Sequence, residues 1–253
     1  MGLFDLPAPL FDAVDGMLGL VLPPVVRLGL WGVLAGWVTM LAYRRLSNQD
    51  RIKELKQEQK TQQAALAAFD GEFEEMWPLI RGALSLGFRQ LGLALGPALL
   101  ATVPVLFLVV WVSGQFGYHQ PQPGQPIAIT SSPTDAPLEW RPAQAAQVSE
   151  GGWKLTWPDP GSSVEMLADG QALLRFPTDK AVPVIHRKLW WNWLVANPIG
   201  YLPDGGSLQQ VNIALPPQQF LALGPGWVRG WMFTFFGVFL LASLAFKFIL
   251  KVD

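Results

Sequence analysis

Cysteine is absent from the sequence and histidine is scarce, with His119 and His186 separated by 67 positions. Without cysteine, the chain has no disulfide and no thiolate metal site. Two distant histidines leave almost no material for a histidine-ligated metal or a Ser-His-Asp triad. We therefore expect no metal site, no cofactor and no enzymatic activity.

Charged residues are also few, and neither sign is in excess. They make up 15% of the 253 residues, with 18 basic against 19 acidic side chains. Because nucleic-acid phosphates demand a basic surface, we do not expect direct binding of nucleic acid. The apolar fraction is 51%, more than one soluble core of this length normally buries. The composition therefore favours a membrane protein.

Three long apolar runs carry few charges or none. The first begins near Pro24, because proline is tolerated in a first helical turn, and its range 24–43 gives about 30 Å of helix, the thickness of the hydrocarbon core. The second, 91–112, is free of charge, and the third, 227–250, is dense in Phe and Leu. We predict a transmembrane helix over each range and a mainly α-helical membrane protein.

Basic residues in the flanking segments determine the expected orientation. Residues 1–17 contain three aspartates and no basic residue, whereas six basic residues lie between positions 44 and 60. We therefore expect the N-terminal segment, 1–23, to lie outside and the C-terminus to lie in the cytoplasm. The expected location is the bacterial inner membrane, with the N-terminus in the periplasm.

A charged helical hairpin is expected in the cytoplasm between the first two spans, over 44–90. The stretch YRRLSNQDRIKELKQEQK has coiled-coil spacing diluted with glutamine, and Asp70-Gly71 is a turn signal. The acidic residues that follow suit the first turn of a second helix. A solvated spacer that only joins two spans is the plainer interpretation. The residues expected in the seam of the hairpin are Ile52, Leu55, Leu66 and Phe69.

The segment 113–226 is too long for a simple connection between spans. The short runs IAIT, PLEW, GGWKLTWP, SVEML and ALLRFP are separated by turn signals, and LQQVNIAL follows them. This pattern predicts a small periplasmic β-sandwich of five to seven strands. Residues 186–202 have the composition of an interfacial helix or, alternatively, of a sandwich edge. The expected interface anchors are Trp190, Trp191, Trp193, Trp227, Arg229 and Trp231.

Three helical segments follow one another in a distinctive pattern and order: YRRLSNQDRIKELKQEQK, MWPLIRGALSLGFRQLGLALGPALLATVPVLFLVVWV and WVRGWMFTFFGVFLLASLAFKFILKV. In these segments the chain resembles the Oxa/YidC insertase superfamily. The resemblance is to the three-span branch, which contains the archaeal YidC-like proteins and the third subunit of the endoplasmic reticulum membrane protein complex. The outer segment, 113–226, lies outside the resemblance.

The resemblance implies a groove among the three spans that opens toward the cytoplasm and holds a polar or basic residue. A short client span would enter the bilayer through this groove, driven by burial of its own apolar surface in lipid. The groove candidates are Arg27, Arg81, Arg89 and Gln90. An arginine inside an apolar run is usually functional, but Arg27 is also placed to snorkel to the outer interface. The other three are alternatively positive-inside anchors.

The expected function is that of a membrane protein insertase or assembly factor, with lipid and client transmembrane segments as its partners. The alternative is a non-catalytic scaffold or accessory subunit that binds a larger inner-membrane complex through the periplasmic domain. A third class is a receptor-like protein whose sandwich captures a periplasmic ligand. These hypotheses leave the oligomeric state open.

Overall fold

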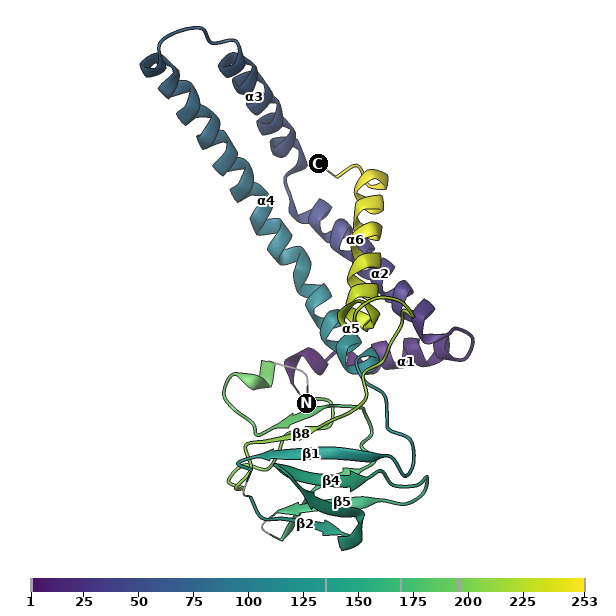
Figure 1. Cartoon of the computed structure of the whole chain (residues 1–253). Coiled ribbons are helices and arrows are strands. Elements are labelled where there is room, and N and C mark those ends of the chain that lie inside the picture. The colour runs from purple at the N-terminus through teal and green to yellow at the C-terminus, as the bar shows by residue number, and fades with distance from the viewer. Residues whose placement is uncertain (1, 135, 169, 195–196, 253) are drawn as a thin grey trace. The chain divides into compact units, whose positions relative to one another are not determined.

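The computed structural model describes residues 2–134, 136–168, 170–194 and 197–252. The chain divides into two compact units. We call residues 1–28 with 107–235 the β-domain unit, and residues 29–106 with 236–253 the arm unit. Three helices are long and apolar enough to cross a membrane, and each contributes residues to both units (Figure 1): α2 (Pro24–Leu46), the Met76–Phe116 part of α4 (Phe73–Phe116), and α6 (Trp231–Ile249).

Helix α2 begins at Pro24, as the sequence predicts, and continues to Leu46. The chain leaves the helix at Ser47, and Asn48 caps the next helix, α3 (Gln49–Ala67). The Asn48 side chain accepts a hydrogen bond from the Arg51 backbone N–H at 3.0 Å, which satisfies one of the unpaired donors at the start of α3.

Helix α4 joins the second half of the hairpin to the second span without a break. The predicted boundary at residue 90 does not interrupt α4, which is continuous over its 44 residues. Pro78, Pro97 and Pro104 all lie inside the helix. Each proline removes one backbone hydrogen bond, whereas ending the helix inside an apolar run would leave several groups unpaired in lipid. Continuation is therefore favoured despite the three prolines.

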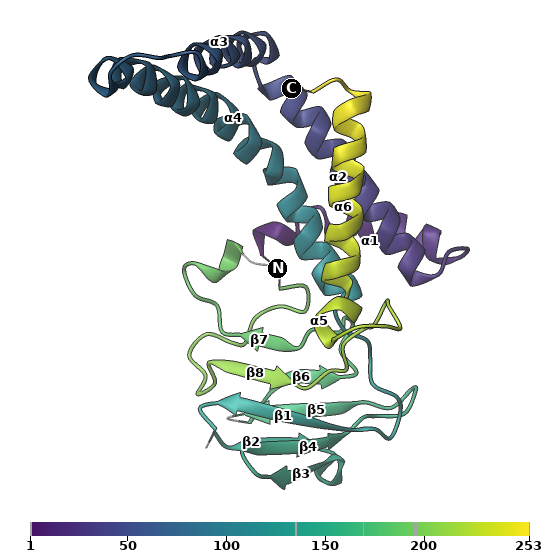
Figure 2. The ribbon, with the colours of Figure 1, turned by 45° about the horizontal axis from the view of Figure 1, so that its top comes forward.

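Helix α3 and the N-terminal part of α4 form an antiparallel arm (Figure 2). The Gln62 amide Nε2 donates to the Leu79 carbonyl at 3.1 Å and ties the two helices together. Ile52 and Leu55 of the predicted seam are buried, and Leu66 and Phe69 are half-buried. The apolar seam of the hairpin therefore faces inward, while most charged side chains of α3 are exposed.

The segment after α4 folds into two antiparallel sheets. The five-stranded sheet has the order β3-β4-β1-β8-β7, and the three-stranded sheet has the order β2-β5-β6. Five to seven strands are predicted and eight are present in the described residues; the additional short ones are β3 and β7. The bounds are β1 (Pro126–Ser132), β2 (Leu138–Arg141), β3 (Ala146–Ser149), β4 (Gly152–Thr156), β5 (Val164–Ala168), β6 (Gln171–Phe176), β7 (Val184–His186) and β8 (Gln210–Ile213).

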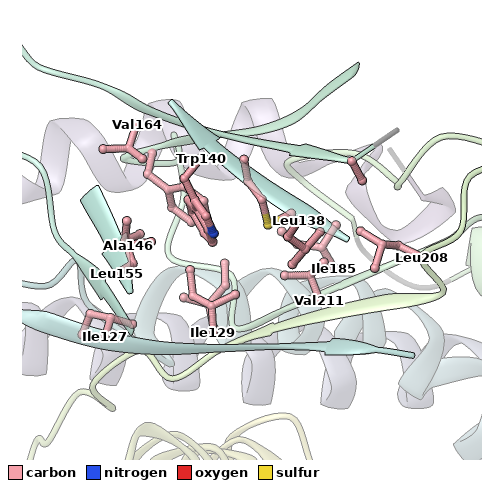
Figure 3. Packing of buried hydrophobic residues seen from close by; sticks show 14 of the residues in the cluster. Ile127, Ile129, Leu138, Trp140, Ala146, Leu155, Val164, Ile185, Leu208 and Val211 are labelled. Atoms are coloured by element: carbon pink, nitrogen blue, oxygen red, sulfur yellow. The ribbon is translucent and has the colours of Figure 1, made fainter. Parts of the chain in front are cut away.

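The two sheets share one apolar core. Ile127 and Ile129 of β1 alternate with exposed or half-buried residues, as expected for a strand with one buried face. Leu138 and Trp140 contribute from the other sheet (Figure 3). Met166 belongs to the same cluster and is fully buried. Burial of both inner faces in one cluster makes the sheets a single domain.

The structure differs from the interfacial helix that is one of the two interpretations of 186–202. His186 ends β7, which pairs with β8 at the edge of the larger sheet, and the short 3-10 helix η3 (Asn192–Leu194) follows. The described residues between 186 and 202 contain no α-helix. Two local causes are the strand pairing of Val184–His186 and Pro198, which disfavours helical geometry at the residue before it.

Two further helical features were not expected. Residues 8–19 of the predicted outer segment form α1 (Ala8–Gly19), preceded by the 3-10 helix η1 (Leu3–Asp5). The third span, predicted over 227–250, is interrupted at Gly230, which separates α5 (Gly226–Arg229) from α6. The Gly230 backbone is extended, so the helical hydrogen-bond ladder restarts at Trp231.

Candidate functional site

An open groove of about 430 Å³ lies among the three span-length helices, within the arm unit. Helix α2 contributes the residues of its C-terminal end, α4 contributes the start of its uncharged run, and α6 contributes its last turn. The C-terminal tail contributes one more lining residue, Val252. The lining residues are Thr39, Met40, Tyr43, Leu91, Ala94, Leu95, Ala98, Ala101, Thr102, Lys247 and Val252.

The groove is mainly apolar, with a few polar groups. Thr39 donates its hydroxyl to the Ala35 carbonyl at 2.8 Å, and Thr102 donates to the Leu99 carbonyl at 2.7 Å. Each hydroxyl is thus satisfied within its own helix and keeps an oxygen that can accept a further hydrogen bond. Among the described lining residues, Lys247 is the one that carries a charge. A cation and hydroxyl oxygens therefore border an apolar floor.

One face of α4 continues the floor of the groove into the arm. Leu91, Leu95, Ala98 and Thr102 follow the i, i+4, i+7, i+11 spacing of one helical face. Extending the same face toward the N-terminus brings in two exposed apolar residues, Leu84 and Phe88. The arm and the groove thus share one uncharged track on α4.

The groove is open on one side, so an occupant need not be enclosed by it. An α-helix with its side chains is about 10–12 Å wide. A groove of this kind can receive one face of a helix, while the remaining faces of that helix stay outside it.

Arg27, the first groove candidate from the sequence, is engaged elsewhere, in the β-domain unit. Its Nη1 lies 2.5 Å from Oδ2 of Asp15, whose side chain is fully buried. The guanidinium also lies over the Phe116 ring, 5.5 Å from its centroid, and Gln115 donates to the same carboxylate at 3.2 Å. Arg27 is therefore part of an internal ion pair and does not line the groove.

The other groove candidates lie on α4 in the arm unit. Arg81 stands over the Trp77 ring at 5.7 Å from its centroid, and Arg89 is exposed. Gln90 is half-buried and directly precedes Leu91, the first groove residue of α4. None of the three is among the described lining residues, so the structure does not bring the four candidates together.

The predicted interface anchors all lie in the β-domain unit. Trp190, Trp191 and Trp193 are exposed around η3, and Trp227 is exposed on α5. The Arg229 carbonyl accepts a hydrogen bond from the Phe220 backbone N–H at 2.7 Å, and Trp231 packs on Phe235 at 6.3 Å between ring centroids.

Sequence reasoning missed the polar residues of the groove for identifiable reasons. Thr39 and Thr102 are uncharged and do not interrupt an apolar run, so they carry no separate signal. Lys247 lies near the end of the third predicted span, 227–250. The signal that could have found it is its position one helical turn inside an otherwise apolar segment, where a charge is usually functional.

The fold is that of a chain with three span-length helices and a small β-sheet domain, which is consistent with a membrane protein. Comparison of the chain with protein-family models, curated proteins and solved structures gave no match. The functional conclusion therefore depends on the geometry of the chain itself.

Proposed function

We propose that the protein is a membrane protein insertase or assembly factor that guides short transmembrane segments into the bilayer along the groove. The observation that carries this proposal is the open groove among the three spans, apolar in its floor and bordered by Thr39, Thr102 and Lys247. The N-terminus and β-domain lie on the periplasmic side and the arm on the cytoplasmic side of a bacterial inner membrane.

The groove chemistry matches the steps that a client segment must make. The apolar face of the client segment exchanges water for the uncharged face of α4. Burial of the client in lipid then drives its transfer from the groove into the bilayer. A polar flank of the client needs a partner while it passes the apolar region, because an unpaired polar group there costs several kcal/mol. Lys247 and the threonine oxygens supply such partners. This process requires no metal, nucleotide or covalent intermediate.

The track on α4 supplies an approach to the groove. Leu84 and Phe88 are exposed on the arm, about two turns and one turn before Leu91, respectively. An apolar client segment can contact these residues first and then move along the same face without crossing a charged position. The arm is therefore proposed to collect clients as well as to connect two spans.

Substitution of Lys247 by leucine tests the role of the charge. We expect Lys247→Leu to slow insertion of a short client with an acidic flank by about threefold to tenfold, equivalent to ~0.6–1.4 kcal/mol. The reason is that the acidic flank of the client loses the cation with which it pairs in the groove. The measurement is protease protection of the client in liposomes that contain the purified protein, compared with empty liposomes.

Two variants serve as controls for this test. Lys247→Arg keeps the charge and is expected to retain most of the rate. Lys251→Gln removes an exposed charge from the same end of the chain without touching the groove, and is expected to leave the rate unchanged. Equal rates for wild type, Lys247→Leu and empty liposomes would favour the scaffold alternative instead.

The scaffold alternative is supported by the β-domain, which the proposed insertion steps do not use. Its edge strand β3 exposes Val148, and exposed sheet edges are common docking sites. Affinity purification with mass spectrometry separates the two functions. One stoichiometric partner supports a scaffold, whereas a varied set of small membrane proteins supports insertion.

A further inference from the structure

Helix α1 has the reverse of the usual amphipathic arrangement, with acidic residues on its inner face and apolar residues on its outer face. Ala8, Asp12 and Asp15 follow the i, i+4, i+7 spacing of one face and are buried or half-buried. Leu10, Val14 and Met17 have the same spacing on another face and are all exposed. A surface helix in water normally shows the opposite pattern.

Every charged residue that precedes Arg27 points inward to a partner. Asp5 accepts hydrogen bonds from the backbone N–H groups of Gly2 and Asn197, both at 2.7 Å. Asp12 accepts from the Trp111 indole at 2.8 Å and from the Lys180 ammonium at 2.7 Å. Asp15 pairs with Arg27. The outer face of α1 is therefore left without charge.

These contacts hold α1 against the ends of two span-length helices within the β-domain unit. Arg27 belongs to the first turn of α2, and Trp111 belongs to the last turns of α4. Only residues 20–23 separate α1 from α2. Helix α1 has 12 residues, about 18 Å, so it is too short to cross a bilayer.

The outer face of α1 is large, continuous and strongly exposed. It continues past the helix into Leu20, which is 85% exposed, and Val21. It begins before the helix with Leu6 of the segment that joins η1 to α1. A surface of this kind is a liability in water, whereas at the boundary of a lipid bilayer its burial is favourable.

A second exposed apolar group lies on the segment that contacts η1. Asn192 fixes the loop that contains η3, because its side chain accepts from the Leu189 N–H at 2.7 Å and donates to the Arg187 carbonyl at 2.8 Å. Trp190 is turned outward and is 86% exposed. Helices η1 and η3 are in contact, and the bond from Asn197 to Asp5 joins their segments.

We propose that these elements form one lipid-binding surface, in which α1 lies in the headgroup and acyl-chain boundary of the leaflet on the β-domain side. The apolar face of α1 enters the acyl chains, and the tryptophans reach the same interface. Arg187 and Lys188 beside the tryptophans suit lipid phosphates. The occupant is lipid because α1 is held to the first turn of a span-length helix and its exposed face carries no charge.

Spin labelling at single cysteines tests this placement, since the natural chain contains no cysteine. Labels at Leu10→Cys, Met17→Cys and Trp190→Cys are compared with a label at Val148→Cys, which is 77% exposed on β3. The purified full-length protein is placed in nanodiscs of phosphatidylethanolamine and phosphatidylglycerol. The readout is accessibility to oxygen, which partitions into acyl chains, and to a water-soluble nickel chelate.

We expect the oxygen-to-nickel accessibility ratio at Leu10 and Met17 to exceed that at Val148 severalfold, with Trp190 between them. A ratio at Leu10 and Met17 equal to that at Val148 would place α1 in water and overturn the proposal. Low accessibility to both reagents would mean that a second protein copy covers the helix, which also overturns it. All four substitutions are at exposed sites, and the result is independent of insertion activity.

Discussion

Replacement of Arg27 by alanine is expected to cause the largest loss of stability in the β-domain unit. Asp15 is fully buried, and Arg27 is its charged partner at 2.5 Å. Breaking a buried ion pair by removing one member costs ~3–5 kcal/mol, because the buried carboxylate loses its charged partner in a medium that solvates it poorly. In thermal unfolding of the purified protein in detergent, this loss corresponds to a fall in Tm of roughly 6–20 °C.

The matched control for Arg27 is the second ion pair made by an aspartate of α1. Lys180 pairs with Asp12 at 2.7 Å, but both side chains are partly exposed, so Lys180→Ala is expected to cost at most about 1 kcal/mol. The double variant Asp15→Ala/Arg27→Ala should recover part of the loss, because no buried charge is left unpaired. Equal Tm changes for Arg27→Ala and Lys180→Ala would contradict the buried ion pair.

Arg27→Ala also separates stability from function. Since Arg27 lies outside the groove, insertion per folded molecule at a permissive temperature is expected to match that of wild type. If Arg27→Ala lost insertion activity while its unfolding curve stayed unchanged, Arg27 would have to act in insertion as a groove residue.

Gly36→Leu is expected to have the second large effect, by forcing α2 away from α6 in the arm unit. A β carbon at Gly36 would lie 2.9 Å from the Ala242 β carbon, 2.9 Å from the Ser243 backbone nitrogen and 3.1 Å from the Phe239 carbonyl oxygen. Close approach of small residues is how membrane helices gain packing without a hydrophobic driving force between them. Because two of the three nearest atoms are backbone, the helices themselves must separate, at a cost of about 2–3 kcal/mol.

Gly29→Leu is the control, because it adds the same side chain to the same helix. A β carbon at Gly29 would have no neighbour within 4 Å, so this variant is expected to be neutral. The measurement is the fraction of protein that remains monodisperse in size-exclusion chromatography after heating. Similar losses for both variants would show that any leucine in α2 is harmful and that Gly36 is not a packing contact.

The elements of this fold follow closely from local signals. Pro24 starts α2 where the sequence places it, because its fixed φ suits a first helical turn and the apolar run after it is long enough to cross a bilayer. Alternating runs such as IAIT become strands, as β1 shows. The strands that escaped detection, β3 and β7, have four and three residues, too few for a period to emerge.

The contacts between elements were less accessible from sequence. The sequence predicts a groove role for Arg27 or snorkelling to the outer interface, and it does not reveal the partner. Asp15 precedes Arg27 by 12 positions, and only the return of the chain through residues 20–23 brings the two together. The buried residues of α3, Ile52 and Leu55, could be predicted because their spacing follows the period of a single helix. The groove depends on three helices, and Lys247 becomes a lining residue only through their packing.

Photo-crosslinking from the groove tests the central claim most directly, namely that a client segment passes between the three spans at the end next to the arm. A benzophenone amino acid is placed at Leu95, which is exposed and lines the groove, or at Leu100, which is exposed on another face of α4 at a similar depth. The client is a short membrane protein held at the insertion stage in reconstituted liposomes.

The expected result is a client adduct from Leu95 that is severalfold stronger than that from Leu100 and that weakens when insertion is allowed to finish. Adducts of equal strength from the two positions, or insertion that proceeds without any adduct from Leu95, would contradict a path through the groove.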